Sequence, residues 1–425
     1  MLECIVEINK INRFFDKMNI AHHECFSNEE IWDLFEKYLR LIEDYVGENI
    51  LYLREPDFHE ELLSSLHNLN TIEFENIMND QFFEELFEIL DEAHEYYFTY
   101  FMPRRSHSSS FIRRTPNPEK IAKRIQELRD RPQPEQRTNE WYLFRYNLLT
   151  ASNAWKAFES QSIKNSLIYE KCSPLNLDKY GTVNMNSAFH WGHKYEPLSV
   201  MMYEEKYKTK VEDFGCIPHA KYEYIGASPD GINVDPTSER YGRMLEIKNI
   251  VNREIDGIPK KEYWVQMQMQ MNVCELNECD FLETKFEEYA DEDAFMADGT
   301  FQETKRGEKK GIIMCFICDG LPKYEYCPLG VSKEEYESWS KEMFGNYDSW
   351  LMNIYWKLPI FSCVLVLRNY QWFDAALPEL ERCWEIIEYE RENGYEHRAP
   401  KKRSPKVEIT EKKKGVCLID LKNIV

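Results

Sequence analysis

The chain has 425 residues, 43% of them hydrophobic, which is enough for one large domain and a smaller one. No apolar run approaches the roughly 18 residues of a membrane-spanning helix, so none is expected. The formal net charge of −22 argues against a chain that is basic throughout, but residues 1–100 hold 24 acidic and 6 basic residues, a net of −18. The remainder is therefore only −4, which leaves room for a local basic groove.

Residues 1–102 are predicted to form an acidic helical module. Apolar residues recur at helical spacing over 29–45 and again over 82–97. The first residues lack a basic region followed by an apolar one, so no secretory signal is expected. A docking module, or a mimic of nucleic-acid charge, is the alternative to a simple helical bundle.

Residues 103–118 are predicted to be a basic, flexible linker. The segment contains Pro103, Arg104, Arg105 and a run of serines, and few of its side chains are suited to burial. We expect a tether, with contact to phosphate as the alternative.

From residue 119 to 395 the pattern changes to strands interleaved with helices, which predicts an α/β domain. The expected helices cover 119–130, 136–146, a short one opened by Ser152 as N-cap, 186–208, 261–275, 333–355 and 377–391. The expected strands lie within 216–249, over 279–286, and near Ile312 and Tyr324. The basic tail, residues 396–425, is interpreted as a solvated end, with a grip on DNA or a nuclear address as alternatives.

The 12 cysteines are scattered and fall mostly in apolar segments, which is typical of reduced core residues in a reducing compartment. Cys315 and Cys318 form a C-x-x-C within an apolar run that indicates a buried strand. Residues three apart on a strand point to opposite faces, so we do not expect this pair to hold zinc or an iron–sulfur cluster.

The segment from Gly226 to Asn249 carries the pattern that points to chemistry. It contains Ser-Pro-Asp-Gly around Asp230, then a turn region rich in Pro, Ser and Gly, then Leu-Glu-Ile-Lys around Glu246. With the turn centred near Ser238, Asp230 lies opposite Glu246 in a hairpin, about 5 Å away. Two carboxylates at that spacing can share one hard divalent cation.

Lys248 stands two residues after Glu246 and therefore shares its face of the strand. A metal that stabilises charge on a phosphate, beside a lysine that orients a water, is an arrangement suited to phosphodiester hydrolysis. The plainer alternative is an ordinary salt bridge between strand residues. Glu283-Thr284-Lys285 is a second E-x-K, interpreted as a neighbouring strand because no S-P-D-G precedes it.

Three glutamines alternate with methionines in the predicted helix 261–275. Gln266 and Gln270 are four residues apart and share a helical face, whereas Gln268 points elsewhere. Buried amides need hydrogen-bond partners, which a metal-bound water or a phosphate would supply. A partly exposed polar helix is the alternative.

Taken together, these motifs resemble the lambda exonuclease and YqaJ-like viral recombinase family, a branch of the PD-(D/E)xK superfamily. The resemblance covers roughly residues 136–286 and is greatest to the versions from large DNA viruses. It implies a restriction-endonuclease-like mixed β-sheet flanked by helices, here with an extra N-terminal helical module. The motifs are Gln136 to Ser152, Trp191-Gly-His-Lys-Tyr-Glu196, Ser228 to Gly231, Leu245 to Lys248 and the glutamine helix.

The resemblance implies roles for individual residues. Asp230, Glu246 and the backbone carbonyl of Ile247 would hold Mg²⁺ or Mn²⁺, and Lys248 would align the attacking water. The remaining implied site residues are Glu196 and Gln268 as catalytic residues, Gln266 as an accessory residue, and Arg145 and Ser152 as ligands of a DNA 5′-phosphate.

The expected function is therefore metal-dependent exonuclease digestion of duplex DNA ends, 5′→3′, in viral DNA recombination, repair or replication. Alternatives are an RNA-directed nuclease, an endonuclease, or a catalytically inactive recombination scaffold. Duplex DNA ends are the expected partner, no membrane contact is expected, and a single-strand annealing protein and a homo-oligomer are left open. The resemblance implies a viral replication site in the host cytoplasm, or the virion, as the location.

Overall fold

The computed structural model describes residues 24–77, 79–108, 117–136, 138–176, 187–318, 320–347 and 349–400. The tail beyond residue 400, residues 109–116 of the predicted linker and the first 23 residues lie outside these ranges. No helix among the described residues is both long and apolar enough to cross a membrane. All ten cysteines in the described part of the chain are free thiols.

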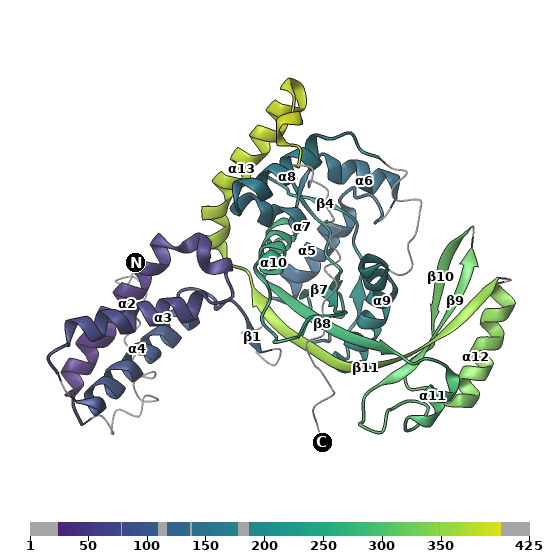
Figure 1. Cartoon of the computed structure of the whole chain (residues 1–425), viewed down its shortest axis with the longest axis horizontal. Coiled ribbons are helices and arrows are strands. Elements are labelled where there is room, and N and C mark those ends of the chain that lie inside the picture. Colours follow the sequence, from purple (N-terminus) through teal and green to yellow (C-terminus); the bar gives the residue numbers. More distant parts are fainter. Residues whose placement is uncertain are drawn as a thin grey trace, which may run out of the picture.

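An N-terminal group of helices forms one end of the molecule (Figure 1). Its elements are α2 (Asn28–Glu48), η3 (Ile50–Arg54), α3 (Phe58–Glu73) and α4 (Asp80–Tyr100). Ser27 starts α2 with a capping box, in which its hydroxyl accepts from the Glu30 amide while the Glu30 carboxylate accepts from the Ser27 amide. The predicted helices over 29–45 and 82–97 are present and slightly longer than expected.

The body of the molecule is a large mixed sheet with the order β10-β9-β11-β8-β7-β6-β3, and β1 pairs with β11 outside this path. The strands are β1 (His107–Ser108), β3 (Val211–Glu212), β6 (Gly231–Asn233), β7 (Met244–Asn249), β8 (Glu278–Glu288), β9 (Lys310–Cys318), β10 (Leu321–Tyr326) and β11 (Trp350–Leu367). A second small sheet has the order β2-β5-β4, made of β2 (Leu149–Thr150), β5 (Ile225–Ala227) and β4 (Ile217–Pro218).

Helices cover both faces of the large sheet, with α9 (Ala188–Tyr207) and α10 (Lys261–Cys274) packed against its central strands. The other helices of the body are α5 (Pro118–Asp130), α6 (Asn139–Tyr146), α7 (Ala151–Ala154), η4 (Trp155–Phe158), α8 (Gln161–Cys172), α11 (Glu292–Ala297), α12 (Lys333–Asn346), α13 (Tyr370–Asn393) and η6 (Glu396–Arg398). Side chains of α9 pack on Leu245 and Ile247 of β7, while α10 shares the main core with Met244 on the opposite face. The predicted mixed sheet flanked by helices, with N-terminal helices added, is confirmed.

The predicted helix over 333–355 is wrong in its second half. α12 ends at Asn346, and β11 begins at Trp350 and runs for 18 residues. β11 pairs with β9 over Trp350–Lys357 and with β8 over Trp356–Leu367, with a bulge between Lys357 and Ile360. The bulge contains Pro359, which lacks an N–H for the ladder.

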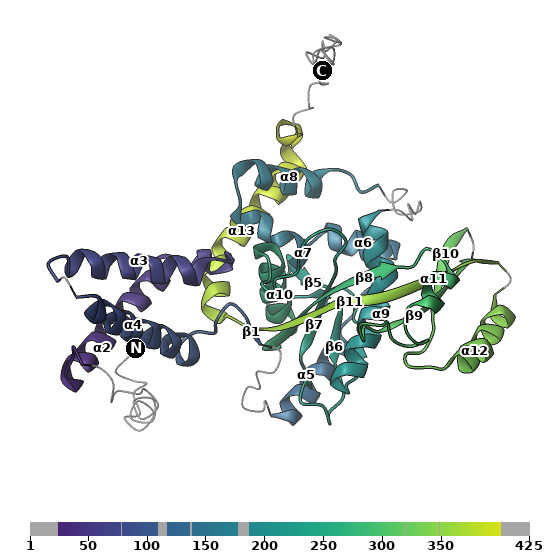
Figure 2. The same cartoon turned by 60° about the horizontal axis from the view of Figure 1, so that its bottom comes forward.

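The expected flexible linker is wrong for its first residues. Arg105 is only 3% exposed, and its guanidinium donates to the Arg54 carbonyl. His107 and Ser108 form β1 against Leu365 and Val364 of β11. One continuous hydrophobic core runs from the N-terminal helices into the α/β body, so the two parts are packed together. Figure 2 shows the N-terminal helices reaching α13, which η3 contacts.

Candidate active site

The hairpin of β6 and β7 brings two predicted site residues together. Gly231 pairs with Leu245 and Ile232 pairs with Met244, so the register places Asp230 opposite Glu246, as the sequence predicts. Asp230 lies just beyond the end of β6, and its Oδ2 accepts from the backbone N–H of Ile247 at 2.7 Å. This hydrogen bond fixes the carboxylate at the edge of β7.

Glu246 is fully buried against α10. Its Oε2 accepts from Gln266 Nε2 at 2.9 Å and from Gln270 Nε2 at 2.7 Å, and its Oε1 forms an ion pair with Lys248. The Lys248 ammonium also lies 4.9 Å from the centre of the Tyr263 ring. Both carboxylate oxygens of Glu246 therefore have a donor, which offsets the cost of burying its charge.

The charges of this cluster act strongly on one another. Burial, together with the carboxylates of Glu246 and Glu196, raises the pKa of Asp230 well above its ordinary value, against the opposing effects of Lys248 and the Ile247 N–H. Burial by itself would lower the pKa of Lys248, but the carboxylates of Glu246 and Asp230 raise it. The cluster therefore has an excess of buried negative charge that one ammonium group does not balance.

The donor set suits a hard divalent cation. Asp230 and Glu246 supply carboxylate oxygens, and the Ile247 carbonyl lies on the same edge of β7 as its N–H, facing Asp230. Gln270 Oε1 is buried without a hydrogen-bond partner among the described residues, an acceptor that a cation-bound water would satisfy. Within the described ranges, no three His, Cys, Asp or Glu side chains form a complete metal cage. Mg²⁺ commonly binds to only one or two carboxylates and takes its other ligands from water and phosphate.

A second cluster surrounds Arg145 near the C-terminal end of α6. The guanidinium donates to Ser152 Oγ at 3.1 Å and to Ser228 Oγ at 3.3 Å, and it stacks 4.2 Å from the centre of the Trp141 ring. Trp141 Nε1 also donates to Ser228 Oγ, at 3.3 Å. Ser228 is two residues before Asp230, so it links the arginine cluster to the carboxylate cluster.

Lys171 of α8 adds a second cation beside Arg145. Its ammonium donates to the Arg145 carbonyl at 2.7 Å, and it is only 4% exposed. Burial, together with the positive charges of Arg145 and Arg391, lowers the pKa of Lys171 to about 7. An anion bound here would favour the protonated form of Lys171, because it would offset both the cost of burial and the repulsion by Arg145 and Arg391.

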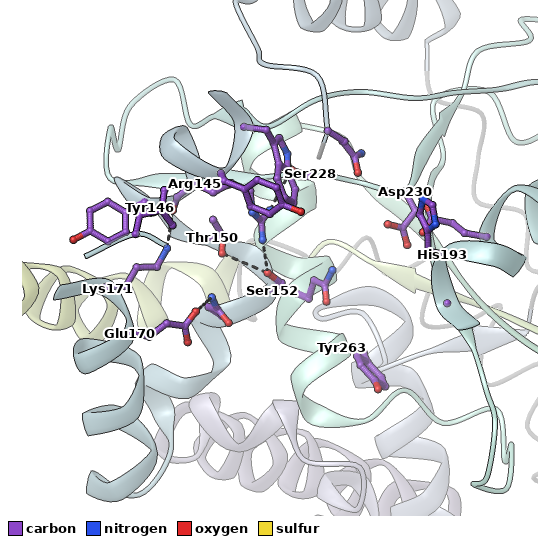
Figure 3. A pocket seen from close by; sticks show the side chains of 18 of the residues that line it. Arg145, Tyr146, Thr150, Ser152, Glu170, Lys171, His193, Ser228, Asp230 and Tyr263 are labelled. Atoms are coloured by element: carbon purple, nitrogen blue, oxygen red, sulfur yellow. Dashed lines mark hydrogen bonds between the residues drawn. The ribbon is translucent and has the colours of Figure 1, made fainter. Parts of the chain in front are cut away.

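One cavity of about 830 Å³ is lined by both clusters. Figure 3 shows Arg145 pointing toward Ser152 and Ser228, and Asp230 beside His193 farther along the same cavity. Glu196 also lines it, on the turn of α9 that follows His193. Asn249, at the end of β7, anchors this helix by bonding to Ser199 Oγ at 2.7 Å and to the Gly192 carbonyl at 3.0 Å.

Residues 140–277 match the model of the YqaJ-like viral recombinase domain. We refer to this span, about a third of the chain, as the YqaJ-like domain, after the family that it resembles. The resemblance expected from the motifs is thus confirmed, and the matched span contains the predicted site residues from Arg145 to Gln268.

An uncharacterized protein of Acanthamoeba polyphaga mimivirus is 30% identical over 311 residues, covering 64% of this chain and 56% of that protein. The chain thus spans little more than half of this relative. An alkaline exonuclease from Laribacter hongkongensis has a TM-score of 0.36 and 20% identity, covering 60% of this chain and 95% of its own. A phage related exonuclease from Haemophilus somnus has a TM-score of 0.33 and 10% identity, covering 58% and 96%.

Two placements expected within the YqaJ-like domain are wrong. Gln268 does not reach the cavity, because its amide donates to the Leu367 carbonyl and accepts from the Asn369 N–H, both at the junction of β11 and α13. Gln270 contacts Glu246 in its place, together with Gln266. Ser152 is not an N-cap, since α7 begins at Ala151 after Thr150, and its hydroxyl accepts from Arg145 instead.

The second E-x-K, Glu283-Thr284-Lys285, lies on β8, where Glu283 is the parallel neighbour of Lys248. Glu283 forms an ion pair with Arg253 rather than with the carboxylate cluster, as expected for a neighbouring strand. Cys315 and Cys318 pack into different clusters on the two faces of β9, so they share no metal. Sequence reasoning missed Lys171, which carries no motif, and Ser228, which the S-P-D-G motif contains.

Proposed function

We propose that the chain is a metal-dependent exonuclease that hydrolyses phosphodiester bonds from the ends of duplex DNA. The observation that carries the proposal is that Asp230, Glu246 and Lys248 meet at one end of a hairpin, where Asp230 and Lys248 line a cavity that also contains Arg145 and Lys171. The match to a viral recombinase domain supports nucleic acid as the substrate.

In this proposal Asp230, Glu246 and the Ile247 carbonyl hold Mg²⁺ or Mn²⁺, with Glu196 as a nearby acid. The cation supplies Lewis-acid stabilisation of the charge that develops on the scissile phosphate. Lys248 holds and orients the attacking water, since Tyr263 and Glu246 fix its ammonium at the cavity wall. Gln266 and Gln270 keep the Glu246 carboxylate in a single orientation.

In the same proposal, the cluster around Arg145 determines the direction of digestion. A terminal phosphate carries more negative charge than an internal phosphodiester, and Arg145 with Lys171 offers two cations to it. Ser152 and Ser228 add hydroxyl groups within reach of the guanidinium. When a 5′-phosphate is bound there, the adjoining phosphodiester lies toward the carboxylate cluster. Cleavage then starts from the 5′ end, which gives 5′→3′ resection.

Lys248→Ala provides the direct test. We expect hydrolysis of end-labelled duplex DNA with Mg²⁺ to fall by about 100-fold or more, because the water loses its positioning group. The thermal transition and DNA binding should be largely retained. Lys285→Ala is the matched control, since it removes the lysine of the other E-x-K on the adjacent strand. Retained hydrolysis in Lys248→Ala would defeat the assignment.

A second prediction concerns the end of the substrate. Replacing Arg145 with Ala should reduce digestion of 5′-phosphorylated duplex by about 10- to 100-fold while changing 5′-hydroxyl duplex much less, since one charge-assisted contact is lost. A time course on both duplexes and on structured RNA, with and without Mg²⁺, measures this. Equal losses on the two duplexes would remove Arg145 from the phosphate site, and preferential RNA cleavage would replace the proposed substrate.

A further inference from the structure

A second cavity, of about 210 Å³, lies where the N-terminal helices meet the YqaJ-like body. It is lined by Pro56, His59, His94, Arg104, Arg105, Ser106 and Ile258. None of these residues belongs to the proposed nuclease site. Ile258 lies in the loop that connects β7 to α10, and Ile250 of the same loop lines the large cavity.

Two histidines form one wall of this cavity. His59 Nδ1 and His94 Nε2 are 3.1 Å apart, and His59 Nε2 accepts from the backbone N–H of Arg105 at 3.4 Å. Burial and neighbouring positive groups lower the pKa of His59 to about 3 and that of His94 to about 4. Both rings are therefore neutral near pH 7, and the positive charge of the wall comes from the two arginines.

Arg105 has an unused donor in this cavity wall. Its Nε and Nη2 donate to the Arg54 carbonyl at 3.2 and 2.9 Å, but its Nη1 is buried and has no hydrogen-bond partner among the described residues. Four carboxylates favour the charged form of Arg105 through space, but none of them forms a hydrogen bond with it; they are Glu55, Asp57, Asp256 and Glu262. A buried guanidinium nitrogen without an acceptor is costly, so an acceptor is expected in the adjoining space.

Arg104 lines the same cavity and is only partly exposed. In the part of the chain that the structure describes, no carboxylate forms an ion pair with it. Two adjacent guanidinium groups, one with an open donor, favour an anion that offers several oxygen acceptors in one plane or face. Phosphate fits guanidinium geometry in this way.

We propose that this cavity binds a phosphate group. Its source is either the monoester of a free mononucleotide, which exonuclease digestion would release, or a phosphodiester of the DNA backbone. Occupancy would stabilise the junction of the two parts, because the Arg105 carbonyl also accepts from Trp264 Nε1 of α10 at 2.9 Å. Through this hydrogen bond, the backbone of Arg105 is connected to α10, the helix that carries Gln266 and Gln270.

The test is isothermal titration of the full chain without divalent metal. An Arg145→Gln background removes the anion site of the large cavity, so that the remaining binding reports the small one. The probes are inorganic phosphate, deoxyadenosine monophosphate, deoxyadenosine and a short 5′-hydroxyl duplex. We expect phosphate and the monophosphate to bind and deoxyadenosine not to bind. Binding of the duplex alone would support the proposal with the backbone as the source.

Adding Arg104→Gln should weaken this binding by about tenfold, because one charge-assisted contact is lost. Arg382→Gln, a change at an exposed arginine of α13, is the matched control. Arg105→Lys tests the open donor directly, and Arg104→Gln keeps the test interpretable if that variant does not fold. Absence of binding by phosphate, the monophosphate and the duplex alike, or equal affinity with and without Arg104, would overturn the proposal. Neither result depends on nuclease activity, so failure of the nuclease assignment remains distinguishable.

Discussion

Gln268 and Gln270 are two residues apart on α10 and serve different parts of the molecule. Gln270 donates to Glu246 in the carboxylate cluster, whereas Gln268 joins α10 to the start of α13. Glu246 and Lys248 could be placed on one face from sequence because strand side chains alternate regularly. The glutamines could not be assigned in this way, because which helical face meets β7 depends on how α10 packs.

The two glutamines should therefore give opposite results when replaced by leucine. Gln270→Leu should lower hydrolysis by about tenfold at nearly unchanged stability, because Glu246 keeps Gln266 and Lys248 but loses one orienting donor. Gln268→Leu should lower the free energy of unfolding by about 1–3 kcal/mol, since a buried N–H and carbonyl lose their partners. Denaturant melts and initial rates on one DNA substrate measure both. The reverse pattern would restore Gln268 to the site.

Lys171 illustrates a functional candidate that sequence could not reveal. It is one of two lysines in α8, and its position next to Arg145 depends on contacts of α8 with α6 and α13. Ser228 and Trp141, by contrast, stand within motifs that the sequence already highlights. The roles of residues within local sequence motifs were predictable, whereas the roles of residues placed by tertiary contacts were not.

At the scale of elements, the first residues of β11, 350–355, were predicted to continue the helix that precedes them. Gly345 and Asn346 mark the C-terminal end of α12, which is a recognisable stop signal. The run from Trp350 to Leu367 is rich in aromatic and branched residues and contains Pro359, all of which favour an edge or bulged strand over a helix. Its pairing with both β8 and β9 is a long-range feature that no local pattern contains.

The helix α4 has an acidic strip whose charge depends on pH. Burial, then the carboxylates of Glu88 and Glu95, raise the pKa of Glu92 to about 7. Because the folded pKa is above the unfolded one, the folded state loses stability as pH rises from about 4.5 to 7, and the loss is complete above 7. Glu92→Gln should therefore stabilise the protein at pH 8 by about 1 kcal/mol after allowance for solvent screening, with no gain at pH 4.

Thermal melts of both proteins across this pH range provide the measurement. Glu84→Gln is the matched control, since it removes an exposed acid from the same helix that is not among the groups acting on Glu92. A gain that is the same at pH 4 and pH 8 would show that the Glu92 effect is not electrostatic.

At the scale of the whole molecule, the N-terminal helices and the α/β body share one core. Arg54 Nη2 donates to the Phe158 carbonyl at 3.2 Å, and Glu55 forms an ion pair with Lys261. η3 also contacts α13 and α10. A chain that begins at residue 103 should consequently fail to fold stably, since each large apolar side chain left exposed costs about 1.5–3 kcal/mol.

Calorimetry and limited proteolysis test this prediction. The full chain should unfold in one main transition, and the truncated chain should be cleaved rapidly or aggregate. A truncated chain that melts at the same temperature as the full one would show that the shared core contributes little. The N-terminal helices were predictable from their periodicity, but burial of Arg105 and formation of β1 were not, because both depend on partners distant in sequence.

β11 changes neighbours within a few residues, and this has a mechanical consequence. Its first half belongs to the projecting arm of β9, β10 and α12, and its second half belongs to the strand layer that contains β7 (Figure 1). The two ladders overlap only at Trp356 and Lys357, just before the bulge at Pro359. The arm is also joined to α9, because the Tyr326 hydroxyl of β10 donates to the Lys194 carbonyl at 2.7 Å and Tyr324 packs in one cluster with Tyr195. A displacement of the arm about this overlap would therefore reach α9, the helix that carries Glu196.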